Sequence, residues 1–239
     1  KKTGVTGIFS KQVKPVVHEV PPLRKSTQKT PSRRLTYSPM IHCLDAHTAP
    51  TLFRRALHRF LEPDEALSRI RECPGIIPVA IDPGYRVIWL DVADNPFHEW
   101  KFRFSVHNLV EQQGVEDCFS TGIRIFSMPE FTLGSHPAPA GFIFHMSKCG
   151  SSAIARVLDQ STRHVVLKEP TPLHENLWQY LTGEWQHPVI ATDENLRLVR
   201  NLLQAIGRTR LPGQHSYFVK FRSWTTAFVD VIQRAFPET

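Results

Sequence analysis

Apolar positions in the first half of the chain follow two different periods. At helical spacing they predict one helix over residues 49–61 and another over residues 63–71. At strand spacing they predict strands over residues 76–81 and 86–92, and the Asp-Pro-Gly-Tyr sequence between these runs predicts a hairpin turn. Two helices followed by a hairpin indicate a small unit of the α+β class.

The next stretch is less regular. Residues 97–113 alternate at first and then drift toward helical spacing, and we predict a helix there. Residues 118–127 predict one further strand, whereas residues 128–140 hold three prolines and are typical of a linker. We therefore expect a domain boundary near residue 138.

In the second half of the chain, short apolar runs alternate with amphipathic segments. Continuous apolar runs are typical of parallel strands buried on both faces, and the amphipathic segments are typical of the helices that cover such a sheet. The predicted strands cover residues 141–146, 164–167 and 216–221, and the predicted helices cover residues 152–160, 193–207 and 223–235, the last one capped by Ser223. The expected fold class is α/β, with a parallel sheet flanked by helices and preceded by the smaller α+β domain.

The formal net charge of +7 is concentrated at the N-terminus. Residues 1–40 hold nine Lys or Arg and a single acid, Glu19, so the rest of the chain is close to neutral. We expect a basic, disordered tail there and no nucleic-acid-binding face on the folded body. The expected organisation is this tail, an N-terminal extension over residues 41–138 and an α/β domain over residues 139–239.

The cysteines and the lengths of the apolar runs indicate the cellular compartment in which the protein is expected. The four cysteines show no C-x-x-C pairing and no secretory signal precedes them, which favours reduced thiols in a cytoplasmic protein. The tail would also suit a transit peptide, but its prolines would break a presequence helix. No apolar run approaches the roughly 20 residues of a membrane span, so we expect no membrane contact.

Both ends of the chain indicate a fragment. The sequence starts without methionine and stops at Thr239, shortly after a Phe-Pro pair. An α/β domain would normally send another strand into its sheet at this point, so we expect the C-terminal domain to be incomplete.

The sequence with the clearest chemical meaning is Phe-Ile-Phe-His-Met-Ser-Lys-Cys-Gly-Ser-Ser, residues 142–152. An apolar strand runs into a loop of small residues and then a helix, so backbone N–H groups and the positive end of the helix dipole converge. Gly150 permits close backbone approach, and Lys148 adds a mobile positive charge. Ser151 and Ser152 add hydroxyl donors. The pattern predicts a site for a phosphate-like anion.

Three common anion-binding loops do not fit this segment. The triphosphate loop G-x-x-x-x-G-K-[ST], aligned on Gly150, needs Gly and Lys where the chain has His145 and Ser151. A cysteine phosphatase loop needs Arg after five intervening residues, but Arg156 follows Cys149 one residue too late, about 100° around the helix. The dinucleotide fingerprint G-x-G-x-x-G keeps only one of its glycines.

The segment resembles the 5'-phosphosulfate-binding loop of the sulfotransferase superfamily, in which Lys or Arg precedes a Gly-Ser/Thr pair after the first strand. The form Phe-His-Met-Ser-Lys-Cys-Gly-Ser is similar to that of a bacterial-type group of sulfotransferase-like P-loop proteins. The resemblance covers residues 141–170 and, more faintly, residues 217–237. It implies a P-loop NTPase-like sheet and 3'-phosphoadenosine 5'-phosphosulfate as the donor, without a metal. The donor-binding residues that it implies are Ser147, Lys148, Cys149, Gly150, Ser151 and Ser152.

The resemblance also implies catalytic roles for Lys148, Glu169 and Lys220. Lys148 would contact the bridging region of the donor. Glu169, directly after the second predicted strand, falls where tyrosylprotein sulfotransferases keep a catalytic glutamate, and Lys220 falls near a second catalytic lysine of those enzymes. Sulfuryl transfer needs a base for the hydroxyl proton and cations for the charge on the bridging and sulfuryl oxygens. We therefore predict transfer of a sulfuryl group to a hydroxyl of a small molecule or peptide, in the crevice at the carboxyl ends of the strands.

Each of these residues also has a plainer interpretation. Glu169 before a proline is compatible with a solvated loop acid, and Lys220 with a lysine that extends from a strand end. Cys149 is better explained as a small loop residue than as a nucleophile, and His145 as a hydrogen-bonded core histidine than as a ligand. The twelve histidines show no H-E-x-x-H spacing, so we expect no metal.

Two other functions stay open. Sulfotransferases bind the 3'-phosphate of the donor through Arg and Ser on a strand that would lie beyond Thr239. Without that strand the donor should bind weakly, since each charge-assisted hydrogen bond to a phosphate is worth about 1.5–3 kcal/mol. A catalytically inactive binding remnant is therefore one alternative. A nucleotide-dependent, kinase-like P-loop protein is the other, although the missing Gly-Lys-Ser argues against it.

Overall fold

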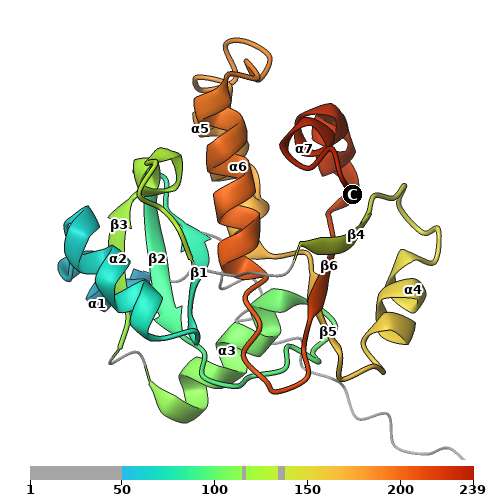
Figure 1. The fold of residues 1–239 in the computed structure, drawn as a ribbon, viewed down its shortest axis with the longest axis horizontal. Helices are drawn as coiled ribbons and strands as arrows, with labels where there is room; N and C mark the ends of the chain where they lie inside the picture. The colour runs from blue at the N-terminus through green and yellow to red at the C-terminus, as the bar shows by residue number, and fades with distance from the viewer. Residues whose placement is uncertain (1–49, 115–116, 134–137) are drawn as a thin grey trace, which may run out of the picture. The chain divides into compact units, whose positions relative to one another are not determined.

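Two three-stranded sheets organise the chain in the computed structural model (Figure 1). The structure describes residues 50–114, 117–133 and 138–239, and the predicted tail over residues 1–40 lies outside this set. All the described residues belong to one compact unit, Pro39–Thr239. The fold is mixed α/β, with a three-stranded parallel sheet flanked by helices.

The first sheet is antiparallel and contains the predicted hairpin. Its strands, in spatial order, are β1 (Ile76–Ile81), β2 (Arg86–Asp91) and β3 (Phe119–Gly122). The strand predicted over residues 118–127 is wrong after Gly122, because the chain there winds into the 3-10 helix η2 (Ile123–Ser127). A strand would send Ile125 and Phe126 to opposite faces, whereas the winding buries both of them.

Three α helices accompany this sheet where helices were predicted, although α1 ends earlier and α3 begins later than predicted. They are α1 (Pro50–His58), α2 (Pro63–Glu72) and α3 (Phe102–Gln113). Pro63 begins α2 with its ring-fixed φ, and Asp64 and Glu65 place negative charge at the positive end of the helix dipole. Helix α3 starts later than predicted, and the residue before it, Lys101, keeps an extended backbone with φ −141° and ψ 146°.

The second sheet is parallel and has its last strand in the centre. Its strands, in spatial order, are β4 (Pro139–Ile143), β6 (Ser216–Lys220) and β5 (His164–Lys168). Its α helices are α4 (Ser151–Leu158), α5 (Glu175–Leu181), α6 (Asp193–Ile206) and α7 (Val229–Ala235), and its 3-10 helices are η3 (Thr171–Leu173) and η4 (Ser223–Phe228). The parallel arrangement is confirmed, because both outer strands run in the same direction as β6.

Two local predictions in this half are wrong. Strand β4 ends at Ile143, not at residue 146, because Ile143 pairs with Lys220 at the end of the ladder and the chain then leaves the sheet. Ser223 does not cap an α helix but begins η4, and the side chain of the preceding Arg222 forms no cap either. Helix α5 was missed, although Leu177, Trp178 and Leu181 give it a buried helical face.

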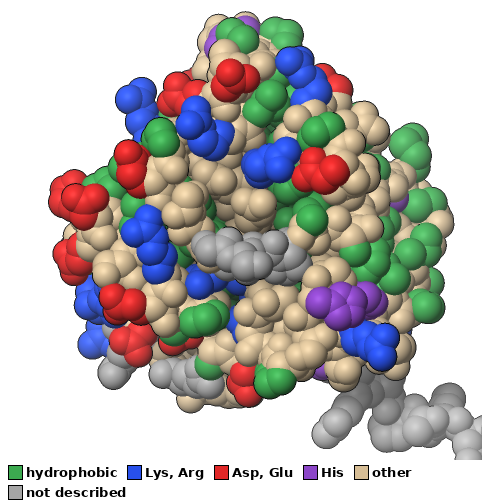
Figure 2. All heavy atoms as spheres, in the orientation of Figure 1, with side chains coloured by type: hydrophobic (Ala, Val, Ile, Leu, Met, Phe, Trp, Pro, Cys, Tyr) green, Lys and Arg blue, Asp and Glu red, His purple; other side chains and the backbone are tan. Residues whose placement is uncertain are grey.

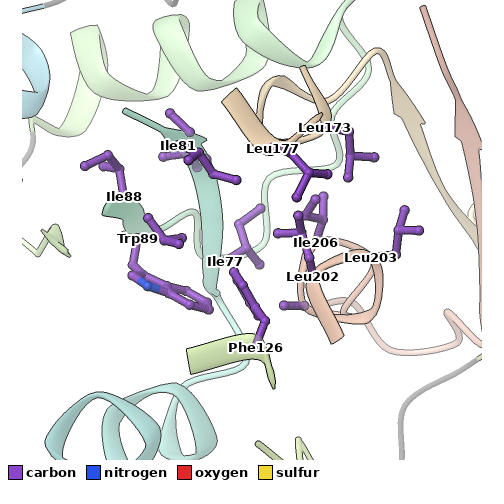
Figure 3. Close-up of a cluster of buried hydrophobic side chains, with 14 of the residues drawn as sticks. Ile77, Ile81, Ile88, Trp89, Phe126, Leu173, Leu177, Leu202, Leu203 and Ile206 are labelled. Atoms are coloured by element: carbon purple, nitrogen blue, oxygen red, sulfur yellow. The ribbon is translucent and has the colours of Figure 1, made fainter. Parts of the chain in front are cut away.

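A shared apolar core joins the two sheets. Helix α6 contacts both β1 and η2, and it stands between the sheets (Figure 1). Figure 3 shows side chains from β1, β2 and η2 facing those from η3, α5 and α6, among them Ile77, Trp89, Phe126, Leu177 and Leu202. The amide of the buried Asn201 donates to the carbonyl oxygen of Phe126 at 2.6 Å. This packing fixes the antiparallel sheet against the parallel sheet.

None of the helices in the described ranges combines the length and apolar character that crossing a bilayer requires.

Candidate functional site

The carboxyl ends of the three parallel strands lie at one edge of the sheet. Strand β4 leads into the loop over residues 144–150, β5 leads into Glu169, and β6 ends at Lys220. The predicted donor loop, which contains Lys148, and the other two predicted catalytic residues are therefore brought to the same edge, where parallel sheets bind their ligands.

Glu169 and Lys220 form a direct ion pair. The Nζ atom of Lys220 lies 2.6 Å from Oε1 of Glu169, and only 4% and 12% of the two side chains are exposed. The backbone N–H of Glu169 also donates to the carbonyl oxygen of Lys220, at 2.7 Å. Glu169 adopts a left-handed backbone with φ 57°, which is uncommon for a residue other than glycine and is typically retained where the surroundings hold it.

Two further cations face the same carboxylate. Nζ of Lys101 lies 3.0 Å from Oε2 of Glu169, and Nε of Arg222 lies 4.0 Å from that oxygen. One negative charge therefore stands among three positive ones, and the surplus favours an incoming anion. Sequence reasoning missed both residues. Arg222 follows Lys220 by two positions, and this spacing in an extended chain puts both side chains on one side; Lys101 carried no such signal.

Burial and ion pairing act in opposite directions on Glu169. Burial is the largest single influence and would raise the pKa of this carboxyl, but hydrogen bonds from Lys220 and Lys101, together with their charges, outweigh it and lower the pKa to about 2. The group is therefore ionised at neutral pH and, in this arrangement, a weak base.

A half-buried histidine supports the backbone of Glu169. Nε2 of His174 donates to the carbonyl oxygen of Glu169 at 3.1 Å. Burial, reinforced by the nearby charge of Arg222, lowers the pKa of His174 to about 3, so the imidazole is neutral. Its other nitrogen, Nδ1, is buried and has no hydrogen-bond partner among the described residues.

The loop before α4 has two residues with a left-handed backbone. Gly150 precedes the helix with φ 82°, and Lys148 is also left-handed, with φ 61°. Residues 147–148 form a tight turn, and Ala153 is the first residue after it with a well-formed backbone hydrogen bond, from its N–H to the carbonyl oxygen of Gly150 at 2.8 Å. Five of the six predicted donor-binding residues are exposed, and Ser151 is buried. The loop can therefore offer several amides to an anion.

His145 attaches this loop to the central strand. Its Nε2 atom lies 2.9 Å from the carbonyl oxygen of Phe221, and the N–H of Phe221 donates to the carbonyl oxygen of Ile143 at 3.1 Å. His145 is hydrogen-bonded, as expected, but it lies beyond the end of β4 and not in the core. The loop is thereby tied to the strand end that carries Lys220.

Lys148 and Cys149 stand apart from the charged cluster, which consists of Glu169, Lys220, Lys101 and Arg222. Lys148 is exposed and makes no hydrogen bond or ion pair with any described residue, so the structure does not bring it into contact with Glu169 or Lys220. Cys149 is an exposed free thiol. Figure 2 shows hydrophobic side chains gathered on the side of the molecule where α4 lies, and Met146, Ile154 and Val157 are exposed there.

A second buried ion pair holds the far end of α4. Nζ of Lys168, the last residue of β5, lies 2.6 Å from Oδ2 of Asp159, which follows α4 directly. The same Nζ donates to the carbonyl oxygen of His98 at 3.2 Å, and Nδ1 of His98 lies 3.2 Å from Oδ1 of Asp159. Helix α4 is therefore anchored both to the parallel sheet and to the segment that leads into α3.

Comparisons with known proteins add no family to this picture. No family model matches the chain, and neither the curated proteins nor the solved structures contain a match. Within residues 50–114, 117–133 and 138–239, no group of three or more His, Cys, Asp or Glu side chains is placed to hold a metal ion.

The positive charges around Glu169 and the amides of the loop before α4 are suited to binding an anion, and the carboxylate of Glu169 can accept a proton.

Proposed function

We propose that this chain binds 3'-phosphoadenosine 5'-phosphosulfate at the loop before α4 and transfers its sulfuryl group to a hydroxyl acceptor. The observation that carries the proposal is the buried Glu169–Lys220 pair, 2.6 Å apart, at the same sheet edge as the loop before α4. The assignment of the second sheet to the P-loop class, a domain boundary near residue 138 and a cytoplasmic location with reduced thiols belong to the same proposal.

In the proposed reaction each group has one task. The loop amides hold the 5'-phosphate, Lys148 contacts the bridging region of the donor, and Lys220 approaches the oxygen that bridges phosphorus and sulfur. Glu169 accepts the proton of the acceptor hydroxyl, whose oxygen attacks sulfur. The bond from sulfur to the bridging oxygen breaks, and this oxygen leaves with its electron pair as part of adenosine 3',5'-bisphosphate.

The low pKa of Glu169 requires that the donor rearranges this cluster. While Lys220 and Lys101 both contact the carboxylate, its pKa is about 2 and it is poorly matched to a general base. Donor oxygens would compete for these ammonium groups, and each contact withdrawn from Glu169 raises its pKa. Donor binding therefore prepares the base.

The same low pKa favours a second candidate, a binding module without catalysis, in which the ion pair is only structural. The two functions differ in a single assay. Transfer of radiolabelled sulfate to a hydroxyl acceptor, abolished by Glu169→Gln, supports the enzyme. Binding of adenosine 3',5'-bisphosphate without any transfer supports the module.

Donor binding is tested directly by calorimetry with adenosine 3',5'-bisphosphate. We expect Lys148→Ala to weaken binding about tenfold, since it removes one charge-assisted contact. Arg54→Ala, at an exposed position of α1, is the control and should leave binding unchanged. Magnesium-dependent binding of ATP in preference to the bisphosphate would instead favour the kinase-like alternative, and equal affinities of wild type and Lys148→Ala would remove the assigned role of this lysine.

A further inference from the structure

Two histidines lie next to each other at the amino ends of two neighbouring parallel strands. His164 is the first residue of β5, and His215 directly precedes β6. The centroids of their imidazole rings are 5.6 Å apart, with an angle of 88° between the planes. The pair therefore lies at the edge of the parallel sheet opposite to the charged cluster, and the function proposed above makes no use of it.

The imidazole ring of His164 is held in one direction by residues of β6. Its Nδ1 atom lies 2.6 Å from Oγ of Ser216, which is also its partner in the ladder between β5 and β6. The ring makes an edge contact with Phe218, with centroids 5.2 Å apart and an angle of 86° between the planes. None of the described residues forms a hydrogen bond with the other ring nitrogen, Nε2. This nitrogen is therefore available to a ligand.

The contact between His164 and Ser216 is of the kind that prepares an imidazole for a metal ion. A histidine that binds a metal through one nitrogen usually donates the N–H of the other to an oxygen, which fixes both the tautomer and the direction of the ring. In His164 the Nδ1–H group would donate to Oγ of Ser216, so that the lone pair of Nε2 is free to bind a metal. Ser216 is then the residue that orients the ligand.

The distance between the two rings suits a shared ion. A zinc–nitrogen bond is about 2.0–2.1 Å long, which places a ring centroid about 3 Å from the metal and two such centroids about 5 Å apart around a tetrahedral ion. The observed 5.6 Å is close to this separation. His215 is exposed, and its side chain makes no hydrogen bond with any described residue. It can therefore turn and bring a ring nitrogen to the same ion as Nε2 of His164.

We propose that His164 and His215 bind a divalent transition-metal ion such as zinc, through Nε2 of His164 and one ring nitrogen of His215, with water in the remaining positions. Imidazole nitrogens suit zinc, copper and nickel, whereas magnesium prefers oxygen ligands. Two protein ligands are fewer than the four of a structural zinc site, so the ion binds more weakly and exchanges with solvent. The bound ion joins the amino ends of β5 and β6 and stabilises the parallel sheet. The expectation of no metal rested on local spacing, which carries no information about histidines from different strands.

Calorimetric titration of the full chain with zinc chloride tests the site. We expect His215→Gln to weaken zinc binding at least tenfold, because it removes one of the two protein ligands. The chain has twelve histidines, so the result is the component of the wild-type isotherm that this variant loses. His187→Gln, at another exposed histidine, is the matched control and should keep that component. Identical isotherms of wild type and His215→Gln would overturn the proposal.

A second measurement distinguishes metal binding from a role in the fold alone. Zinc should raise the thermal midpoint of the wild type but not that of His215→Gln, and magnesium should raise neither. Ser216→Ala keeps both ligands but removes the oxygen that orients His164, so zinc affinity should fall about tenfold. Ser216→Thr keeps a hydroxyl and suits a strand, and it should retain the affinity. If zinc shifts the midpoints of wild type and all three variants equally, these side chains serve only the fold and the proposal fails.

Discussion

The ammonium group of Lys220 lies 2.6 Å from the carboxylate of Glu169, so that the ends of two neighbouring parallel strands are joined by a buried charge pair. The backbone N–H of Glu169 reinforces this junction, since it donates to the carbonyl oxygen of Lys220. Removing Lys220 would take the nearest cation from a largely buried carboxylate and leave Lys101, at 3.0 Å, and Arg222, at 4.0 Å, as its remaining partners.

Lys220→Met should destabilise the protein by up to about 3 kcal/mol, the lower end of the usual cost of breaking a buried pair, because Lys101 and Arg222 still face the carboxylate. Lys101→Met removes the second lysine of the same carboxylate, but 23% of this side chain is exposed, so its loss should cost about 1 kcal/mol or less. Urea unfolding of both variants measures the difference. The double variant Lys220→Met/Glu169→Gln should recover much of the loss; equal destabilisation by the two lysine variants would contradict the buried-pair interpretation.

Stability should fall in two steps as the pH is lowered. In the unfolded chain His174 takes up a proton below about pH 6.5, whereas in the folded chain the imidazole stays neutral down to about pH 3. Protonation therefore favours the unfolded chain, and stability is lost as the pH falls from about 6.5 to about 3. Glu169 adds a second loss between about pH 4.5 and its folded pKa of about 2. Urea midpoints measured from pH 8 to pH 3 test both steps.

Two variants show which residue causes each of the two losses of stability. His174→Gln should flatten the curve between pH 6.5 and 4.5, and Glu169→Gln should flatten only its lower end. A wild-type curve that is level from pH 7 to pH 4 would show that His174 is protonated in the folded state.

Gly150→Ala should separate backbone strain from anion binding. Gly150 has φ 82°, and a Cβ atom placed on it would meet nothing within 4 Å, so the cost is the left-handed conformation alone, about 1–2 kcal/mol. Gly213 has φ 86° with the same open surroundings, which makes Gly213→Ala a matched control. We expect similar losses of stability from both, and weaker binding of adenosine 3',5'-bisphosphate in Gly150→Ala only. Unchanged binding in Gly150→Ala would argue against an anion-binding turn.

His145→Ala should loosen the loop from β6. It removes the contact from Nε2 to the carbonyl oxygen of Phe221, worth about 1 kcal/mol of stability as an ordinary hydrogen bond. The loop amides would then be less well positioned, and bisphosphate affinity should fall several-fold in calorimetry. His187→Ala, at an exposed position, is the comparison variant. A stability loss without any change in affinity would indicate that the contact serves only the fold.

The most periodic segments were the ones that the sequence predicted best. Helix α6 places Leu198, Leu202 and Ile206 on its buried side, and the predicted bounds differ from the observed ones by one residue. Strand β5 is a short apolar run and was also found. The errors fall where pairing or winding overrides the local pattern, as at Ile143, where the ladder ends, and at Ser223, where a 3-10 helix begins.

The sequence by itself determined which residues would be buried and where a loop of small residues would interrupt them, because periodicity and glycine act over a few neighbouring positions. Glu169 and Lys220 could be placed at strand ends on that basis. Only the tertiary structure decided that Lys101 joins them. Its position depends on how α3 and the antiparallel sheet pack against the parallel one, and packing between distant segments leaves no local pattern to read.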